Sequence, residues 1–452
     1  MELQSVNKVY FLGIGGIGMS ALARHFLAKG VSVFGYDKTP SEITNSLINE
    51  GAEVHFTDSP ELIPGNIDLI IYTPAIPKEL NEFILLKDSG KPFYKRAEIL
   101  GMLAEGKKTI AVAGTHGKTT VSTIIAHIFK TANINFSAFL GGISANYNSN
   151  YITNGDCEWV VAEADEFDRS FLNLHPDIAV ITAIDADHLD IYKSKENLIE
   201  SFRLFAQNIK PKGTLIIKNG LDTPLGYKEK LINYHSCNQS DIYAQNIVIE
   251  SGKYFSDFAG LIEGSNIHLG LPGKHNLENA LAASTVSFCI GIKPELIFNA
   301  LSTFKGVKRR FEICYNKNNT VYIDDYAHHP EEIKACINAA RELYPNKKIT
   351  GVFQPHLYSR TKDFANDFAK SLSNLDELVM LDIYPAREKP IDGVSSEIIL
   401  KDVSIKDKSI ITKQNLIDFL KTKDIELLLT MGAGDIDRFT EQIKAMLESR
   451  GK

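Results

Sequence analysis

The chain has 452 residues, with 49 basic and 56 acidic side chains, so its formal net charge is −7. Hydrophobic residues make up 44% and charged residues 23%, an ordinary globular composition that allows several buried cores. At about 150 residues per domain, this length predicts about three domains. An acidic chain lacks the basic surface that non-specific binding to nucleic acid or to a membrane requires, so we expect neither as a partner.

The cysteines and the apolar runs indicate a cytoplasmic protein. The five cysteines are widely spaced and none forms a CxxC pair, which argues against a disulfide framework and against a zinc site. Reduced thiols are typical of the cytosol. Residues 1–8 lack the basic-then-apolar pattern of a signal peptide. No apolar run reaches the length of about 18 residues that a membrane-spanning helix needs.

A glycine-rich loop follows the first expected strand, residues 9–12. Gly13, Gly15 and Gly18 form a complete GxGxxG motif, and a helix is expected from there to about residue 29. Asp37 stands 19 residues beyond Gly18, at the end of a second expected strand, 31–36. This pattern is typical of NAD-binding units. Its chemistry, however, specifies only a diphosphate at a helix N-terminus, so an NAD-dependent oxidoreductase and a protein that holds a UDP-linked substrate both remain open.

A second glycine loop follows an expected strand over residues 109–113. It runs Gly114-Thr115-His116-Gly117-Lys118-Thr119-Thr120 and leads into a helix expected to reach about residue 129. The window 112–119 matches a Walker A motif except that Val112 replaces the first glycine. The two glycines allow backbone N–H groups to turn toward phosphate oxygens. Lys118 can reach the β- and γ-phosphates, and the Thr119 hydroxyl can bind Mg²⁺.

Acidic residues follow a third expected strand, 159–162, as they do in a Walker B strand. Glu163 comes first, and Asp165 and Glu166 follow it. His188 lies in another acidic stretch, beyond a strand expected at 178–181, and could be a metal ligand or a helix cap. An oxidoreductase has no use for the second phosphate loop. A ligase that activates a nucleotide-linked carboxylate has a use for both loops, so the pair favours a ligase.

The C-terminal third reads as another α/β region, with strands expected at 321–323, 349–353, 377–381 and 426–431. Polar side chains follow the first two of these strands, where α/β sheets bind ligands. They are Asp325, Tyr326, His328 and His329 after the first strand, and Arg360 after the second. Earlier in the chain, Asn276 and Asn279 lie on one face of an expected helix that also contains His275, and amides can recognise a purine edge.

Taken in order, these motifs resemble the Mur ligase family over essentially the whole chain, and the family's ATP loop also lacks the leading glycine. The resemblance implies an α/β fold of three domains. Residues 1–104 would form a Rossmann-like domain that binds the UDP substrate. Residues 105–306 would form a central P-loop ATPase-type domain, and residues 307–452 a Rossmann-like C-terminal domain that contributes to ATP and amino-acid binding.

The resemblance also implies a reaction: ATP-dependent ligation of L-alanine to the lactoyl carboxylate of UDP-N-acetylmuramate through an acyl phosphate, in peptidoglycan precursor synthesis. The complete glycine loop is similar to that of the L-alanine-adding branch. A recycling ligase that adds a preformed tripeptide is the nearest alternative. ATP and Mg²⁺ would be the cofactors, and the enzyme would be a monomer or a dimer.

The resemblance assigns roles to individual residues. The ATP site would contain the loop Gly114–Thr120, the adenine-side residues His275, Asn276 and Asn279, and Arg310 and Asp325 from the third domain. The substrate site would contain Gly13, Gly15, Gly16, Ile17, Gly18, Asp37, Thr73 and Tyr326. Magnesium would be held by Thr119, Glu163 and His188. The catalytic set would be Lys118, Glu163, His188, His328, His329 and Arg360. Leu357 stands where the family usually has arginine, and Ser201-Phe202-Arg203 stands where several sister ligases carry a modified lysine.

Overall fold

The computed structural model describes residues 3–185, 192, 194–221, 226–227, 229–250, 252–386 and 388–450. The chain forms two compact units. One contains residues 1–246, 256–267 and 278–304, and the other contains residues 247–255, 268–277 and 305–452. In the described part of the chain, no helix is both long enough and apolar enough to span a membrane.

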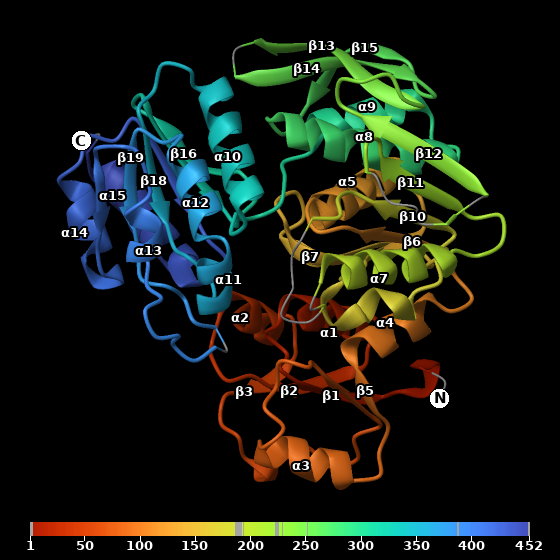
Figure 1. Ribbon diagram of the computed structural model, residues 1–452. Helices are drawn as coiled ribbons and strands as arrows, with labels where there is room; N and C mark the ends of the chain where they lie inside the picture. The colour runs from red at the N-terminus through yellow and green to blue at the C-terminus, as the bar shows by residue number, and fades with distance from the viewer. Residues whose placement is uncertain are drawn as a thin grey trace. The chain divides into compact units, whose positions relative to one another are not determined.

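The N-terminal sheet is parallel, with strand order β3-β2-β1-β4-β5. Helices α1, α2 and α4 cover one face and α3 covers the other (Figure 1). Strand β1 lies in the centre and is buried from Val9 to Leu12, as its apolar run predicts. The bounds are β1 Lys8–Leu12, α1 Ile17–Ala28, β2 Ser32–Tyr36, α2 Glu42–Asn49, β3 Glu53–His55, β4 Leu69–Tyr72, α3 Asn81–Asp88, β5 Phe93–Lys95 and α4 Arg96–Ala104.

The central sheet has the order β15-β14-β13-β12-β11-β10-β6-β9-β7-β8. Helices α5, α8 and α9 lie on one face of its parallel part and α7 lies on the other (Figure 1). Its strands are β6 Lys108–Ala113, β7 Phe136–Ser144, β8 Ser149–Asn154, β9 Trp159–Glu163, β10 Ile178–Ile181, β11 Thr214–Lys218, β12 Lys230–His235, β13 Ile242–Glu250, β14 Lys253–Gly260 and β15 Gly264–Leu269. Its helices are α5 Lys118–Thr131, α7 Lys195–Gln207, α8 Lys274–Cys289 and α9 Pro294–Thr303.

One hydrophobic core joins these first two sheets. It runs from Val9 and Phe11 through Leu22 and Phe26 of α1 to Phe139 of β7 and beyond. Helix α1 therefore packs against the β7–β8 hairpin as well as against its own sheet. Such a shared core explains why the N-terminal sheet and the strands β6–β12 belong to one compact unit.

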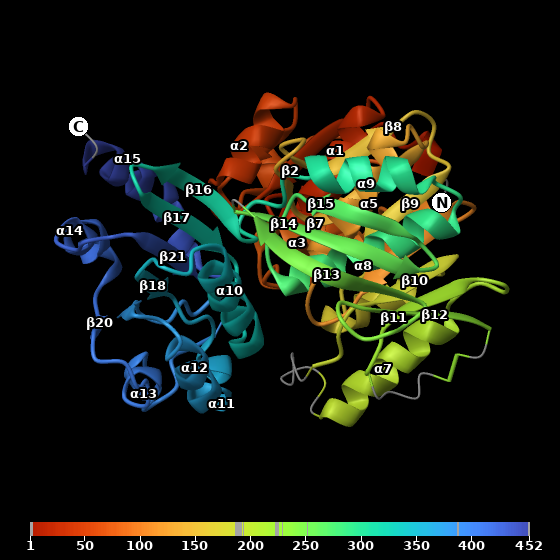
Figure 2. The same cartoon turned by 90° about the horizontal axis from the view of Figure 1, so that it is seen from above.

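The C-terminal sheet has the order β16-β17-β21-β18-β19-β20, and only the β16–β17 pair is antiparallel. Helices α10 and α12 lie on one face, and α14 and α15 lie on the other (Figures 1 and 2). The strands are β16 Glu312–Lys317, β17 Thr320–Asp325, β18 Ile349–Phe353, β19 Glu377–Met380, β20 Lys408–Ile410 and β21 Leu427–Met431. The helices are α10 Pro330–Leu343, α11 Tyr358–Asp363, α12 Ala365–Leu372, α13 Glu397–Leu400, α14 Leu416–Lys421 and α15 Thr440–Arg450.

The expected α/β fold with three sheet regions is confirmed, and each strand expected from the sequence is present within about two residues of its expected ends. Sequence reasoning missed β3, β5, the β7–β8 hairpin, the strands from β11 to β16, and β20. Strands β8 and β13, for example, mix polar with apolar residues and carry exposed ones, so they lack the continuous apolar run that marks a strand buried on both faces. Strand β11 has such a run, but it is only three residues long. The domain limits at 104/105 and 306/307 remain predictions.

Candidate active site

The second glycine loop connects β6 to α5, as the Walker-like pattern predicts. Strand β6 lies between β10 and β9, and the loop leaves its carboxyl end. Gly114 has a φ of 130°, and a methyl group there would come closer than 3.0 Å to Thr182 and Ala183. Gly117 has a φ of 82° immediately before α5. Only glycine satisfies both positions without strain, so the backbone N–H groups can face an anion at the start of α5.

Lys118, at the first position of α5, is deeply enclosed. Its Nζ donates to the Gly114 carbonyl at 2.6 Å and to Glu166 Oε1 at 2.9 Å. Burial by itself would lower the pKa of Lys118, but the carboxylates of Glu166, Asp165 and Glu163 outweigh burial and raise that pKa above its ordinary value. The ammonium therefore stays charged and is held between the Gly114 carbonyl and the Glu166 carboxylate.

The rest of the loop is fixed by residues that follow β10. Thr115 Oγ1 accepts the Asp185 backbone N–H at 3.1 Å, and His116 Nε2 lies 3.4 Å from Asp185 Oδ2. Thr182 donates its hydroxyl to the His116 carbonyl. These bonds therefore tie the loop after β6 to the segment that follows its parallel neighbour β10.

Thr119 and Thr120 are buried in the first turn of α5. Asn279, on α8, lies against this loop, because a methyl group on Gly117 would come within 2.6 Å of its Oδ1. One turn earlier on α8, Asn276 donates its side-chain N–H to the Pro272 carbonyl at 2.7 Å. His275 adjoins Asn276 in that same first turn.

Glu163 ends β9, next to β6, with Val112 and Glu163 in register. The Gly141 N–H donates to Glu163 Oε2 at 2.9 Å. A carboxylate and a threonine hydroxyl at the phosphate end of one sheet are hard oxygen donors, which Mg²⁺ prefers when nucleotide phosphates and water complete its shell. The residues present therefore fit a nucleotide-bound Mg²⁺. Among the described residues there is no group of three or more His, Cys, Asp or Glu side chains that could hold a metal by itself. His188, the third predicted ligand, lies outside the described residues.

The first glycine loop connects β1 to α1. Asp37 accepts the Gly15 backbone N–H at 2.8 Å, so this acid holds the loop. Gly13 has a φ of 87°, and a methyl group there would come within 2.7 Å of Thr73. At Gly18 a methyl group would come within 2.8 Å of the Arg96 guanidinium. Helix α1 begins at Ile17, and its N-cap, Gly16, offers no side chain to cap the helix N-terminus.

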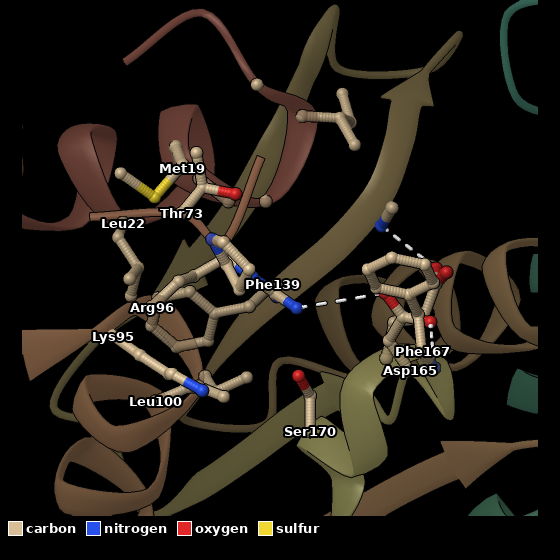
Figure 3. A pocket seen from close by; sticks show the side chains of 18 of the residues that line it. Met19, Leu22, Thr73, Lys95, Arg96, Leu100, Phe139, Asp165, Phe167 and Ser170 are labelled. Atoms are coloured by element: carbon tan, nitrogen blue, oxygen red, sulfur yellow. Dashed lines mark hydrogen bonds and ion pairs between the residues drawn. The ribbon is translucent and has the colours of Figure 1, made fainter. Parts of the chain in front are cut away.

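A pocket of about 260 Å³ joins this loop to the acidic end of β9. Gly16, residues of the first turns of α1 and Thr73 line one side, and Glu163 and Asp165 line another. Figure 3 shows apolar side chains from α1, α4 and β7 facing this space, with Asp165 and Phe167 across from them. Arg96 extends across the pocket to within 3.8 Å of Asp165. The pocket can therefore contact both an anionic nucleotide-linked group and the residues around Lys118.

In the C-terminal unit, Asp325 ends β17 and is buried. Its two oxygens accept the N–H groups of Phe311, at 2.6 Å, and Ala327, at 2.7 Å. Burial raises the pKa of Asp325 to about 7. The guanidinium groups of Arg309 and Arg310 each lie 5.0 Å from the Tyr326 ring centroid. The basic run and the end of β17 thus form one cluster.

The predicted histidines come just before α10, and His329 is its N-cap. Glu332 Oε2 accepts the backbone N–H groups of His328, at 3.1 Å, and His329, at 3.3 Å. His328 Nδ1 also lies 2.9 Å from the Tyr326 carbonyl oxygen. Beside them, after β18, an Arg360 nitrogen lies 3.5 Å from His356 Nδ1, and the His356 and His328 rings are 6.1 Å apart. The structure brings these C-terminal residues together at one edge of their sheet.

Leu357, where the family usually has arginine, caps α11 with a φ of 68°. Sequence reasoning also missed Arg96 and Phe139, which line the pocket, and Gly141, which contacts Glu163. No motif contains them, and the only available signal was the glycine pair at 141–142, inside a stretch that was not predicted as a strand.

Three domain models of one family match most of the chain. Residues 8–108 match the catalytic domain of the Mur ligase family, residues 112–287 match the Mur ligase middle domain, and residues 309–434 match the Mur ligase glutamate ligase domain. The chain belongs to the Mur ligase family. It is an ATP-dependent ligase by this membership, and the Val112 departure from the Walker pattern is consistent with it.

Curated Mur ligases resemble the chain from end to end. The UDP-N-acetylmuramate–L-alanine ligase of Flavobacterium psychrophilum is 50% identical over 455 residues, and that of Phocaeicola vulgatus is 47% identical over 459 residues; both alignments cover 100% of each chain. Among solved structures, the UDP-N-acetylmuramate–alanine ligase of Thermotoga maritima matches with a TM-score of 0.83 and 28% identity, over 98% of this chain and 99% of that one. A murein peptide ligase of Psychrobacter arcticus shares the fold, with a TM-score of 0.71 and 21% identity over 97% and 98% of the two chains.

Proposed function

We propose that this Mur ligase joins L-alanine to the lactoyl carboxylate of UDP-N-acetylmuramate at the expense of ATP, releasing ADP and phosphate, in the cytoplasmic synthesis of peptidoglycan precursors. The observation that carries the proposal is the pocket shared by the N-terminus of α1 and the acidic end of β9. A diphosphate at α1 and a nucleotide at the β6–α5 loop would place their reacting ends on the same side of the central sheet.

The reaction needs activation because a carboxylate has no adequate leaving group. A carboxylate oxygen attacks the γ-phosphorus and ADP leaves, which forms an acyl phosphate. The amine of L-alanine then attacks the acyl carbon, and phosphate leaves with the original carboxylate oxygen. Lys118 would neutralise charge on the transferred phosphoryl group, since it remains protonated beside the loop.

The remaining predicted residues take supporting roles in this proposal. Thr119 and Glu163 would hold Mg²⁺, which, when bound, neutralises phosphate charge. Asn279 with His275 and Asn276 would contact adenine, and Arg310 with Asp325 would contribute to ATP binding. Tyr326, His328, His329 and Arg360 would serve the amino acid, with an imidazole taking the amine proton near neutral pH.

Two other functions are less favoured. The curated relatives named above share 47–50% identity with the chain and carry the L-alanine ligase name, whereas the murein peptide ligase shares 21%. For an NAD-dependent oxidoreductase, the enclosed Lys118 and its phosphate loop would have no function. Asp37, which could bind an adenosine ribose in such an enzyme, accepts the Gly15 N–H.

A coupled assay of ADP release tests the proposal. We expect release that requires both UDP-N-acetylmuramate and L-alanine, and little release with a preformed tripeptide. With ¹⁸O in the lactoyl carboxylate, one label should appear in the released phosphate, which reports the acyl phosphate. Use of the tripeptide in place of L-alanine would support the recycling ligase, and reduction of NAD would support the oxidoreductase.

A further inference from the structure

We propose that the β7–β8 hairpin positions both ends of the pocket: Gly141 sets the direction of the Glu163 carboxylate, and Asn150 holds the first turn of α1. This inference rests on the proposed function, because that function gives the two ends their ligands. It assigns positioning roles to two residues that belong to neither glycine loop.

Gly141 is required for the space that a side chain would fill. Its N–H donates to Glu163 Oε2 at 2.9 Å. A methyl group at this position would come closer than 3.0 Å to both carboxylate oxygens and to the carboxyl carbon of Glu163. The Glu163 carboxylate therefore contacts the β7 backbone at Gly141, and any side chain at 141 would push it to another rotamer. Since Gly141 itself lacks a positive φ, the requirement is space and not backbone freedom.

Asn150 performs a separate task on β8. Its side chain is fully buried, and its amide N–H groups donate to the Ile17 carbonyl at 2.6 Å and to Ser20 Oγ at 2.9 Å. Its oxygen accepts from Arg24. Ile17 is the first residue of α1, so an amide from the central sheet fixes the helix end that would face the diphosphate.

Arg24 connects Asn150 to α2 and its C-cap. Its Nε donates to Glu50 at 2.9 Å, and its Nη2 donates to Ser46 at 3.1 Å. Phe139 of β7 also lines the pocket, together with Met19 of α1. One hairpin thus connects the metal-binding acid to the helix terminus through rigid strand backbone.

The two contacts can be removed one at a time, and each variant serves as the control for the other. Gly141→Ala should weaken binding of Mn²⁺, used in place of Mg²⁺ with a non-hydrolysable ATP analogue, by about 10–100-fold, as for other residues that orient a metal ligand. Its affinity for UDP-N-acetylmuramate should change less than about twofold. Asn150→Ala should lower the affinity for UDP-N-acetylmuramate about tenfold, which corresponds to the loss of one good buried hydrogen bond. It should leave the affinity for Mn²⁺ unchanged. Electron paramagnetic resonance measures the first affinity and isothermal titration calorimetry the second.

Two further variants separate positioning from simple destabilisation. Asn150→Asp keeps an acceptor for Arg24 but cannot donate to Ile17 or Ser20, so it should bind the sugar nucleotide as weakly as Asn150→Ala does. Glu163→Asp, added to Gly141→Ala, shortens the carboxylate and should recover part of the Mn²⁺ affinity. Thr153→Ala, at an exposed site on the same hairpin, should change neither affinity.

The inference is overturned if Gly141→Ala and Asn150→Ala weaken both ligands equally, if they change only the thermal midpoint, or if Asn150→Asp binds normally. Failure of the wild-type enzyme to bind UDP-N-acetylmuramate would instead refute the proposed function, and the Mn²⁺ arm would still test Gly141.

Discussion

Lys118 Nζ lies 2.9 Å from the carboxylate of Glu166, and both side chains are almost fully enclosed. Glu166 is the last acid of the stretch after β9, so this pair connects the phosphate loop to the acidic edge of the sheet. A nucleotide phosphate would compete with Glu166 for the same ammonium. The pair should therefore affect both the rate of phosphoryl transfer and the stability of the fold, and separate variants can measure each effect.

Lys118→Met should lower turnover by at least about 10²–10³-fold, because it removes the cation beside the transferred phosphoryl group and keeps the side-chain volume. The measurement is the steady-state rate of ADP release. Lys130→Met is the matched control on the same helix, since Lys130 is exposed and contacts Thr153 and Asn154. Near-normal turnover of Lys118→Met would refute the assignment of the phosphate loop.

Glu166→Gln should lower the free energy of unfolding by about 3 kcal/mol, because it leaves the buried Lys118 charge with weaker compensation. Denaturant unfolding, followed by fluorescence, measures the change. In the background of Lys118→Met the same substitution should cost much less, since no buried cation remains. Equal costs in both backgrounds would show that the two side chains are not coupled.

Acid should destabilise the first compact unit. Burial lowers the pKa of His25 to about 4 and that of His127 to about 4. Because the folded pKa lies below the unfolded value of about 6.5, each ring contributes stability that is complete above pH 6.5 and is lost as pH falls toward 4. Between pH 7.5 and pH 5 the loss should be about 2 kcal/mol per histidine.

His127→Asn tests this contribution. The ring of His127 bonds Tyr147 and Thr303, so the variant should be less stable at every pH, but its stability should fall less steeply below pH 6.5. Denaturant unfolding at several pH values gives both slopes. Between pH 7.5 and pH 9 the two slopes should coincide, since the ring is neutral there. Parallel curves below pH 6.5 would contradict the prediction.

Tyr326→Leu should lower the unfolding free energy of the C-terminal unit by about 1–2 kcal/mol, because it removes the ring that lies against both Arg309 and Arg310. Tyr326→Phe keeps the ring face and should be nearly neutral. Thermal unfolding monitored by calorimetry compares the two. A loss as large in the phenylalanine variant would assign the effect to the hydroxyl.

Elements with strong local signals could be predicted from the sequence. Strands such as β6 and β18 consist mostly of buried apolar residues, and the glycines of the loop Gly114–Thr120 allow the turn that a phosphate loop needs, so sequence patterns predict both. Glu163 is likewise predictable, because it directly follows the apolar run that forms β9 and therefore stands at the end of that strand. The two glycine motifs, the fold class and the family therefore followed from residues close together in the chain.

Contacts between residues far apart in the chain depend on how the elements pack. The contact of Gly141 with Glu163 spans 22 residues, and that of Asn150 with Ile17 spans 133. Neither contact has a signature in the neighbouring sequence. Asn150 of β8 reaches Ile17 only when α1 packs on the β7–β8 hairpin, and Gly141 reaches Glu163 only when β7 pairs with β9. Short stretches of sequence fix which chemical groups line the two loops. Packing determined which of them meet, because the free energy of burying α1 and the hairpin together selects contacts that no short stretch of sequence encodes.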